Sequence, residues 1–148
     1  MGDPEIAHVV LTANAIDIEM ARLAEGRARS PVVLRFAATM ISDHTAVNGR
    51  AEALAGRLGV EPRDNSVSRS LREDAAPVIE RLTGLSGLDF DRAYLAREVG
   101  YHENVLEAMD GVLLPNVRNG ELRALLVEVR PAFEAHLQDA RDARVTLR

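Results

Sequence analysis

The chain has 148 residues, 47% of them hydrophobic and 28% charged, which predicts one globular domain covering residues 1–148. The net charge of −5 argues against a basic nucleic-acid-binding surface, and the absence of cysteine excludes disulfides, thiolate metal sites and cysteine nucleophiles. Because aromatic residues make up only 3% and tryptophan is absent, the core must consist mainly of aliphatic side chains, which favours packed helices.

The first helix is predicted to begin with Asp3 as its N-cap and Pro4 in the first helical position, a favourable pairing. Apolar residues then recur every three or four positions, which predicts one buried stripe. That stripe consists of Ile6, Val9, Ala13, Ile16, Met20 and Leu23. Gly26 and the pair Ser30-Pro31 are predicted to end this helix and to cap the next one.

The second helix is predicted to continue to Leu58, where Gly59 closes it. One face is apolar except for a single histidine, and it consists of Val33, Phe36, Ala37, Met40, His44, Val47, Ala51, Leu54 and Leu58. The polar stretch EPRDNSVS then predicts a connection. A shorter helix should follow from about Val67 to Leu82, with a break or a new start near Pro77.

Two further long helices are predicted, one from about Asp89 to Leu114 and one from about Glu121 to the C-terminal region, with a kink or restart at Pro131. Each pair of long helices is joined by a tight turn. A link of about 25 to 30 residues between the pairs is longer than a simple up-down-up-down bundle needs. The expected fold is all-α: a ferritin-like four-helix bundle with a long crossover that contains a short fifth helix.

Three of the four histidines fall on buried stripes, one on each of the last three long helices: His44, His102 and His136. Glu19 borders the stripe of the first helix, and Glu98 precedes His102 by one turn. At a rise of about 1.5 Å per residue, these groups can converge in the middle of a bundle. The five residues predict a mononuclear metal site suited to zinc, copper or iron, and a poor fit for magnesium or calcium.

A metal-free alternative stays open, because a single buried histidine is more often structural than a ligand. The chain would then be a helical structural or interaction module with a buried histidine hydrogen-bond network. Asp43 is expected at the surface or behind the ligands, where it would hold a ligand in place. Tyr94 is expected in the core with its hydroxyl group satisfied, and His8 near the surface or the end of the bundle.

Several segments together resemble a widespread bacterial family of ferritin-like domains of unknown function, often described as predicted outer-membrane or exported proteins. The matching segments are NAIDIEMARLAEGRA (14–28), VLRFAATMISDHTAVNGRAEALAGRLGV (33–60), FDRAYLAREVGYHENVLE (90–107) and RPAFEAHLQDA (130–140). The recognisable marks are the Asp-His pair, the tyrosine followed eight residues later by histidine, and the proline followed five residues later by His-Leu.

The resemblance implies a ferritin-like bundle. It also implies that Glu19, His44, His102 and His136 are important residues of the site. It does not imply a particular reaction. Classical ferritins place Glu-x-x-His on two helices. Ile41 and Phe133 occupy the glutamate positions here, so a ferroxidase or storage role is doubtful. A role in metal handling or stress protection remains the leading expectation, and a dinuclear oxidase the weakest.

The expected location follows from the resemblance and from the start of the chain. No apolar run approaches the ~20 residues that span a bilayer, and MGDPEIAHVV is not a signal peptide. The protein is therefore either cytoplasmic or a chain whose leader has been removed. The helix cap so close to the start favours the second, with a periplasmic, extracellular or envelope-associated protein. The expected partner is a metal ion, and a homodimer is a further expectation.

Overall fold

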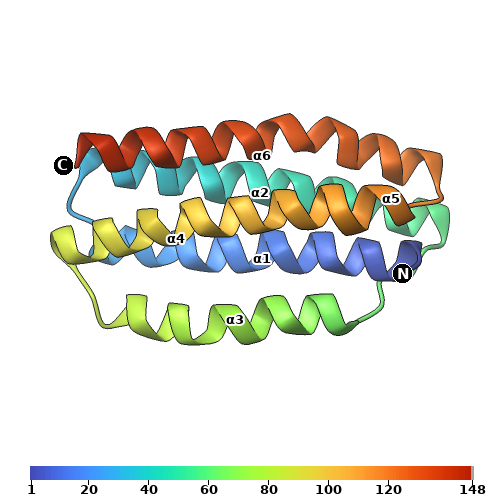
Figure 1. Ribbon diagram of the computed structural model, residues 1–148, viewed down its shortest axis with the longest axis horizontal. Coiled ribbons are helices and arrows are strands. Elements are labelled where there is room, and N and C mark those ends of the chain that lie inside the picture. The colour runs from blue at the N-terminus through green and yellow to red at the C-terminus, as the bar shows by residue number, and fades with distance from the viewer. Residues whose placement is uncertain (148) are drawn as a thin grey trace.

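The computed structural model describes residues 1–147, which are helical with short connections and contain no strand (Figure 1). This confirms the all-α prediction. The helices are α1 (Asp3–Arg27), α2 (Pro31–Leu58), α3 (Ser66–Thr83), α4 (Gly87–Ala108), the π-helical turn η1 (Met109–Leu113), α5 (Leu114–Asn116) and α6 (Gly120–Thr146). None of the helices in this part of the chain combines the length and the apolar character that a membrane crossing requires.

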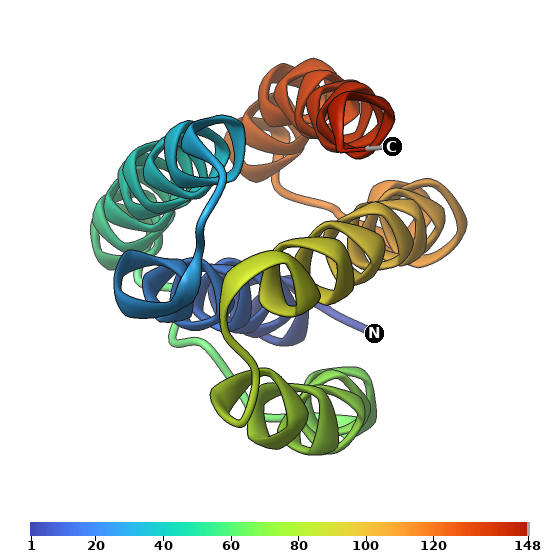
Figure 2. The same cartoon turned by 90° about the vertical axis from the view of Figure 1, so that its left-hand side faces the viewer.

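The four long helices α1, α2, α4 and α6 lie side by side, and each of them contacts two of the others around the ring seen end-on in Figure 2. Helix α3 belongs to the predicted crossover between α2 and α4 and lies outside this ring, against α1 and α4 (Figure 1). The centre of the ring is therefore lined by the inner faces of four helices from different parts of the chain.

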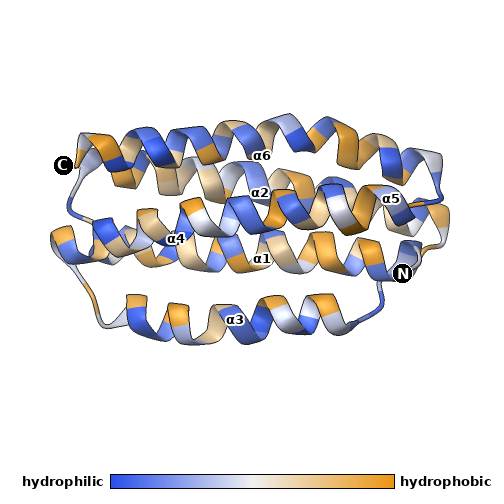
Figure 3. Ribbon diagram, viewed as in Figure 1, coloured by the Kyte–Doolittle hydropathy of each residue, from blue (hydrophilic) through white to orange (hydrophobic). Residues whose placement is uncertain are grey.

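The core consists of the apolar faces of these helices and includes most of the residues on the predicted stripes. Ile6, Met20, Met40, Phe90 and Leu126 have no exposed surface at all. Hydrophilic and hydrophobic residues alternate along every long helix, as the spacing of an amphipathic helix requires (Figure 3). Burial of these aliphatic and aromatic side chains supplies the main driving force for folding.

Two helices continue through a proline, although the sequence predicts a break or new start near Pro77 and a kink or restart at Pro131. Pro77 lies inside α3 and Pro131 inside α6, and both helices continue past them. A proline removes the hydrogen bond to the carbonyl group four residues earlier. Those residues, Glu73 and Val127, are exposed, so water can hydrate the freed carbonyl groups.

The start of α1 also differs by one residue from the prediction, because Gly2 is the N-cap and Asp3 is the first helical residue. The Asp3 carboxylate instead accepts hydrogen bonds from the backbone N–H groups of Arg118 and Asn119, at 2.9 and 3.0 Å. It thus fastens the chain's N-terminal end to the turn before α6. Ser30 caps α2 as predicted, accepting from the backbone N–H of Val32.

The turn between α1 and α2 is held by a carboxylate of α4. Asp91, which has no exposed surface, accepts hydrogen bonds from the backbone N–H groups of Arg29 (3.1 Å) and Ser30 (2.8 Å). Because hydrogen bonds to a charged group are strong, Asp91→Ala should lower the free energy of unfolding by about 2–3 kcal/mol. For a chain of this length that corresponds to a drop in Tm of about 4–12 °C, measurable by circular dichroism. The exposed Asp89→Ala is the control, and an equal Tm for the two variants would contradict the role of Asp91.

Candidate metal centre

Three histidines from three different helices meet in the centre of the ring. His44 lies on α2, His102 on α4 and His136 on α6, with exposed fractions of only 2–4%. One ring nitrogen from each lies within 4.8 Å of one from each of the others. Each histidine occupies a stripe position of its helix, so the packing that buries the apolar stripes also brings the imidazole rings together.

Each imidazole is held by a hydrogen bond on one of its two ring nitrogens. The Nδ1–H of His44 donates to the side-chain oxygen of Asn14 (2.7 Å), and the Nδ1–H of His102 donates to the backbone carbonyl of Glu98 (2.9 Å). The Nε2–H of His136 donates to the carboxylate of Asp43 (2.8 Å). Because every acceptor is an oxygen, the hydrogen on each ring is fixed, and the second nitrogen retains its lone pair.

The orientation of Asn14 is itself determined by a second hydrogen bond. Its amide nitrogen donates to the side-chain oxygen of Asn48 at 2.8 Å. The amide nitrogen of Asn48 in turn donates to the carbonyl group of Leu11 at 3.2 Å. The amide oxygen of Asn14 is therefore the atom that faces His44, and it can only accept a hydrogen bond.

The second nitrogens of the three rings have no hydrogen-bond partner. They are Nε2 of His44, Nε2 of His102 and Nδ1 of His136. A pattern in which one nitrogen is anchored to an oxygen and the other is left bare is typical of metal-binding histidines. Three buried polar atoms without partners are costly in a metal-free core, where nearly all such atoms are satisfied.

Two carboxyl groups without any exposed surface complete the cluster, Asp17 on α1 and Glu98 on α4. One carboxyl oxygen of Asp17, one of Glu98 and one ring nitrogen of His102 all lie within 4.8 Å of one another. None of their four carboxyl oxygens forms a hydrogen bond with a residue in the range 1–147. The centre therefore receives at least one potential ligand from each of the four long helices.

The closest contact in the cluster joins Nε2 of His44 to Oδ2 of Asp17, at 2.8 Å. The two groups are not oriented for a hydrogen bond, since both atoms lack a partner. With the ring hydrogen on Nδ1, a nitrogen lone pair faces a carboxylate oxygen, which is unfavourable without a positive charge. Two ligand atoms about 2.1 Å from one ion would lie about 3–3.4 Å apart, close to the observed separation.

Burial raises the pKa of Glu98 well above its usual range, and the neighbouring Asp17 raises it further. Burial also opposes ionisation of Asp17, but contacts with Glu98 and His44 outweigh it and lower the pKa of Asp17. The two pKa shifts favour an ionised carboxylate at Asp17 beside a protonated carboxylic acid at Glu98. Burial lowers the pKa of His102 and of His136, which favours the neutral imidazole that a metal ion requires.

Aromatic rings close the cluster on two sides. The Phe133 ring lies 5.3 Å from that of His44 and 6.5 Å from that of His102, centroid to centroid. Tyr94, one turn before Glu98, is fully buried and stacks on Phe90 at 5.5 Å. Its hydroxyl group has no partner, contrary to the expectation that it is satisfied, and its pKa is raised well above the ordinary value by burial and by Glu98.

The structure places the predicted site residues together with one exception. His44, His102 and His136 form one close group, Glu98 forms a second one with His102 and Asp17, and Glu19 is exposed. The acid of α1 is Asp17, which sequence reasoning missed. Two residues along a helix correspond to a rotation of about 200°, so Glu19 lies almost opposite Asp17. The signal for Asp17 was its spacing, four residues after Ala13 and three before Met20 on the buried stripe.

Two other predicted positions agree with the structure. Asp43 lies behind a ligand candidate: its half-exposed carboxylate holds His136 from the solvent side. His8 lies near the start of α1, away from the three clustered histidines, and contacts the hydroxyl group of Ser68 at 2.8 Å. Asn14, which orients His44, was not predicted, because asparagine at a stripe position has no charge that would mark it.

The model of the family described as "Domain of unknown function (DUF4142)" matches residues 1–143. No curated protein and no solved structure matches the chain.

Proposed function

Because the chain belongs to the DUF4142 family of domains of unknown function, we propose its function from the cluster itself: a metal-binding, ferritin-like four-helix domain with one mononuclear site. The ligands are His44, His102 and His136 with Asp17, and Glu98 is a second carboxyl group within reach. Imidazole nitrogens with one or two carboxylates suit zinc, copper or iron.

The single observation that supports the proposal most strongly is the set of bare ring nitrogens. Each of the three histidines uses one nitrogen for a hydrogen bond and leaves the other without a partner, and one ring nitrogen of each lies within 4.8 Å of one from each of the others. The alternative, a metal-free network of buried hydrogen bonds, would require partners for these nitrogens and for Asp17 and Glu98. A bound cation would supply a partner for the imidazole nitrogens and for a carboxylate at the same time.

The proposed role is metal handling or stress protection in the cell envelope. The metal part of this role is supported by the cluster, and the envelope part by the resemblance of the sequence motifs to exported proteins. The classical di-iron arrangement does not apply, because Phe133 fills one of the glutamate positions with an apolar ring that covers His44 and His102.

Elemental analysis of the full chain, purified without added metal or an affinity tag, tests the proposal. We expect about one zinc, copper or iron ion per chain, and its loss in the double variant His44→Ala, His102→Ala. His8→Ala is the matched control, since it removes the one histidine outside the cluster. Circular dichroism should show that all variants remain helical.

Thermal unfolding provides the second measurement. An ion that binds only the folded chain stabilises it by about 2.7 kcal/mol at a concentration a hundred times its Kd. Added zinc should therefore raise the Tm of the natural chain and of His8→Ala, and leave the double variant unchanged. The absence of metal in every sample, with a Tm insensitive to both metal and chelator, would refute the proposal in favour of the metal-free module.

A further inference from the structure

Two grooves of similar size run between helices on the surface. The arginines on their rims differ in whether they have a carboxylate partner. The first groove, about 610 Å³, lies between α3 and α4, and the second, about 520 Å³, lies between α2 and α6. Both have an apolar floor with arginine side chains along the rim. None of the residues that line them belongs to the candidate metal centre, so a ligand in either groove would bind independently of the proposed metal site.

In the second groove each arginine forms an ion pair with a glutamate of the same chain. Arg50 binds the carboxylate of Glu128 at 2.7 Å, and Arg57 binds the carboxylate of Glu121 at 2.5 Å. Both pairs bridge α2 to α6 across the groove. Each arginine on this rim therefore already has a carboxylate partner.

In the first groove the arginines have no such partner. Its rim contains Arg81 from α3 and Arg92 and Arg97 from α4. The arginine ion pairs found within residues 1–147 involve Arg50, Arg57, Arg69, Arg72, Arg130 and Arg141. The Nε atom of Arg97 is moreover buried and without a hydrogen-bond partner.

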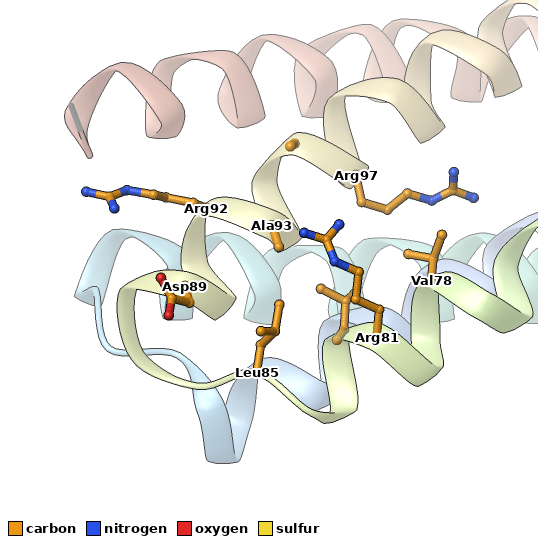
Figure 4. A pocket seen from close by; sticks show the side chains of 9 residues that line it. Val78, Arg81, Leu85, Asp89, Arg92, Ala93 and Arg97 are labelled. Carbon is orange, nitrogen blue, oxygen red and sulfur yellow. The ribbon is translucent and has the colours of Figure 1, made fainter.

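The Arg97 side chain is held in place by an aromatic ring. Its guanidinium lies 5.2 Å from the centre of the Tyr101 ring, and the Tyr101 hydroxyl group donates to the carbonyl of Ala13 at 2.8 Å. Figure 4 shows the Arg81 and Arg97 side chains near one end of the groove, and Asp89 and Arg92 near the other. Asp89, the only acidic residue of the range 1–147 that lines the groove, lies at the end near Arg92, so the end that holds Arg81 and Arg97 has no carboxylate on its rim.

We propose that this groove binds the carboxylate of a small amphiphilic molecule, with the carboxylate at Arg81 and Arg97 and the alkyl chain on the apolar floor. Guanidinium groups bind carboxylates through paired, charge-assisted hydrogen bonds. The floor is formed by Val78, Leu82, Leu85, Ala93 and Ala96. From Arg97 back to Asp89 the groove follows α4 for about 12 Å, a length that accommodates the chain of octanoate.

Isothermal titration of the full chain with octanoate tests this inference. We expect saturable binding that weakens about tenfold or more in the double variant Arg81→Gln, Arg97→Gln, because two charge-assisted contacts are lost. The matched double variant Arg50→Gln, Arg57→Gln changes the arginines of the second groove and should leave the affinity unchanged. Thermal unfolding of both variants establishes that each is folded.

Three further ligands separate the contributions of head and tail. Octyltrimethylammonium should not bind, since it reverses the charge. Octanol and acetate, which lack the carboxylate and the chain respectively, should each bind much more weakly than octanoate. The proposal is wrong if octanoate shows no saturable binding, if either single-feature ligand binds as tightly as octanoate, or if the second-groove variant loses as much affinity as the first.

Discussion

Asp17→Asn is expected to weaken metal binding more than about a hundredfold, a larger loss than the 10- to 100-fold typical of residues that only support a ligand. The substitution keeps the shape of the side chain and removes the negative charge that faces Nε2 of His44 at 2.8 Å. The affinity can be measured by competition with a chromogenic chelator, with zinc as the probe.

Glu19→Gln is the matched control for Asp17→Asn. It makes the same kind of change two residues later on α1, but at an exposed position. Its affinity should equal that of the natural chain. If Glu19→Gln were the damaging variant, the assignment of the acid from α1 would return to Glu19, and if neither variant changed the affinity, no acid of α1 would be a ligand.

The second large effect concerns stability. Phe133→Ala should lower the free energy of unfolding by about 3–5 kcal/mol, because it removes a nearly fully buried ring and leaves a cavity. For a chain of this length the Tm should fall by about 6–20 °C. The loss combines the transfer free energy of the ring with the contacts it makes to the imidazoles of His44 and His102.

Val127→Ala is the control on the same helix, since Val127 is 56% exposed and its truncation should change the Tm very little. Urea unfolding of both variants gives the free energies directly. A loss below about 1 kcal/mol for Phe133→Ala, the range of a volume-conserving swap, would show that the site collapses around the missing ring.

The sequence was sufficient for the helices because their buried faces repeat with helical period and their ends have clear signals. Ser30 before Pro31 and the left-handed Gly59 lie where the pattern places them. No break occurs at Pro77 or Pro131, because the effect of a proline depends on whether the freed carbonyl group can reach water. That depends on which face of the helix is exposed.

The site was partly predictable for a related reason. Histidines stand out on an apolar stripe, so three candidate ligands could be named from spacing alone. Asp17 was not predicted, because Glu19 also stands at helical spacing from apolar residues, three after Ile16 and four before Leu23. Which of two acids points inward is decided by the rotation of α1 against α2 and α4, which local sequence does not contain.

The way the cluster is divided along the chain has a consequence for the order of events in folding. The N-terminal hairpin of α1 and α2 contains Asp17 and His44, whereas Glu98, His102 and His136 all lie in the C-terminal half. Neither half holds a complete set, so full coordination would have to wait until the two halves have docked. If the halves dock after the rate-limiting barrier, an ion captured only then would stabilise the finished fold and not the transition state. It would prolong the lifetime of the native state while leaving the speed of its formation almost unchanged.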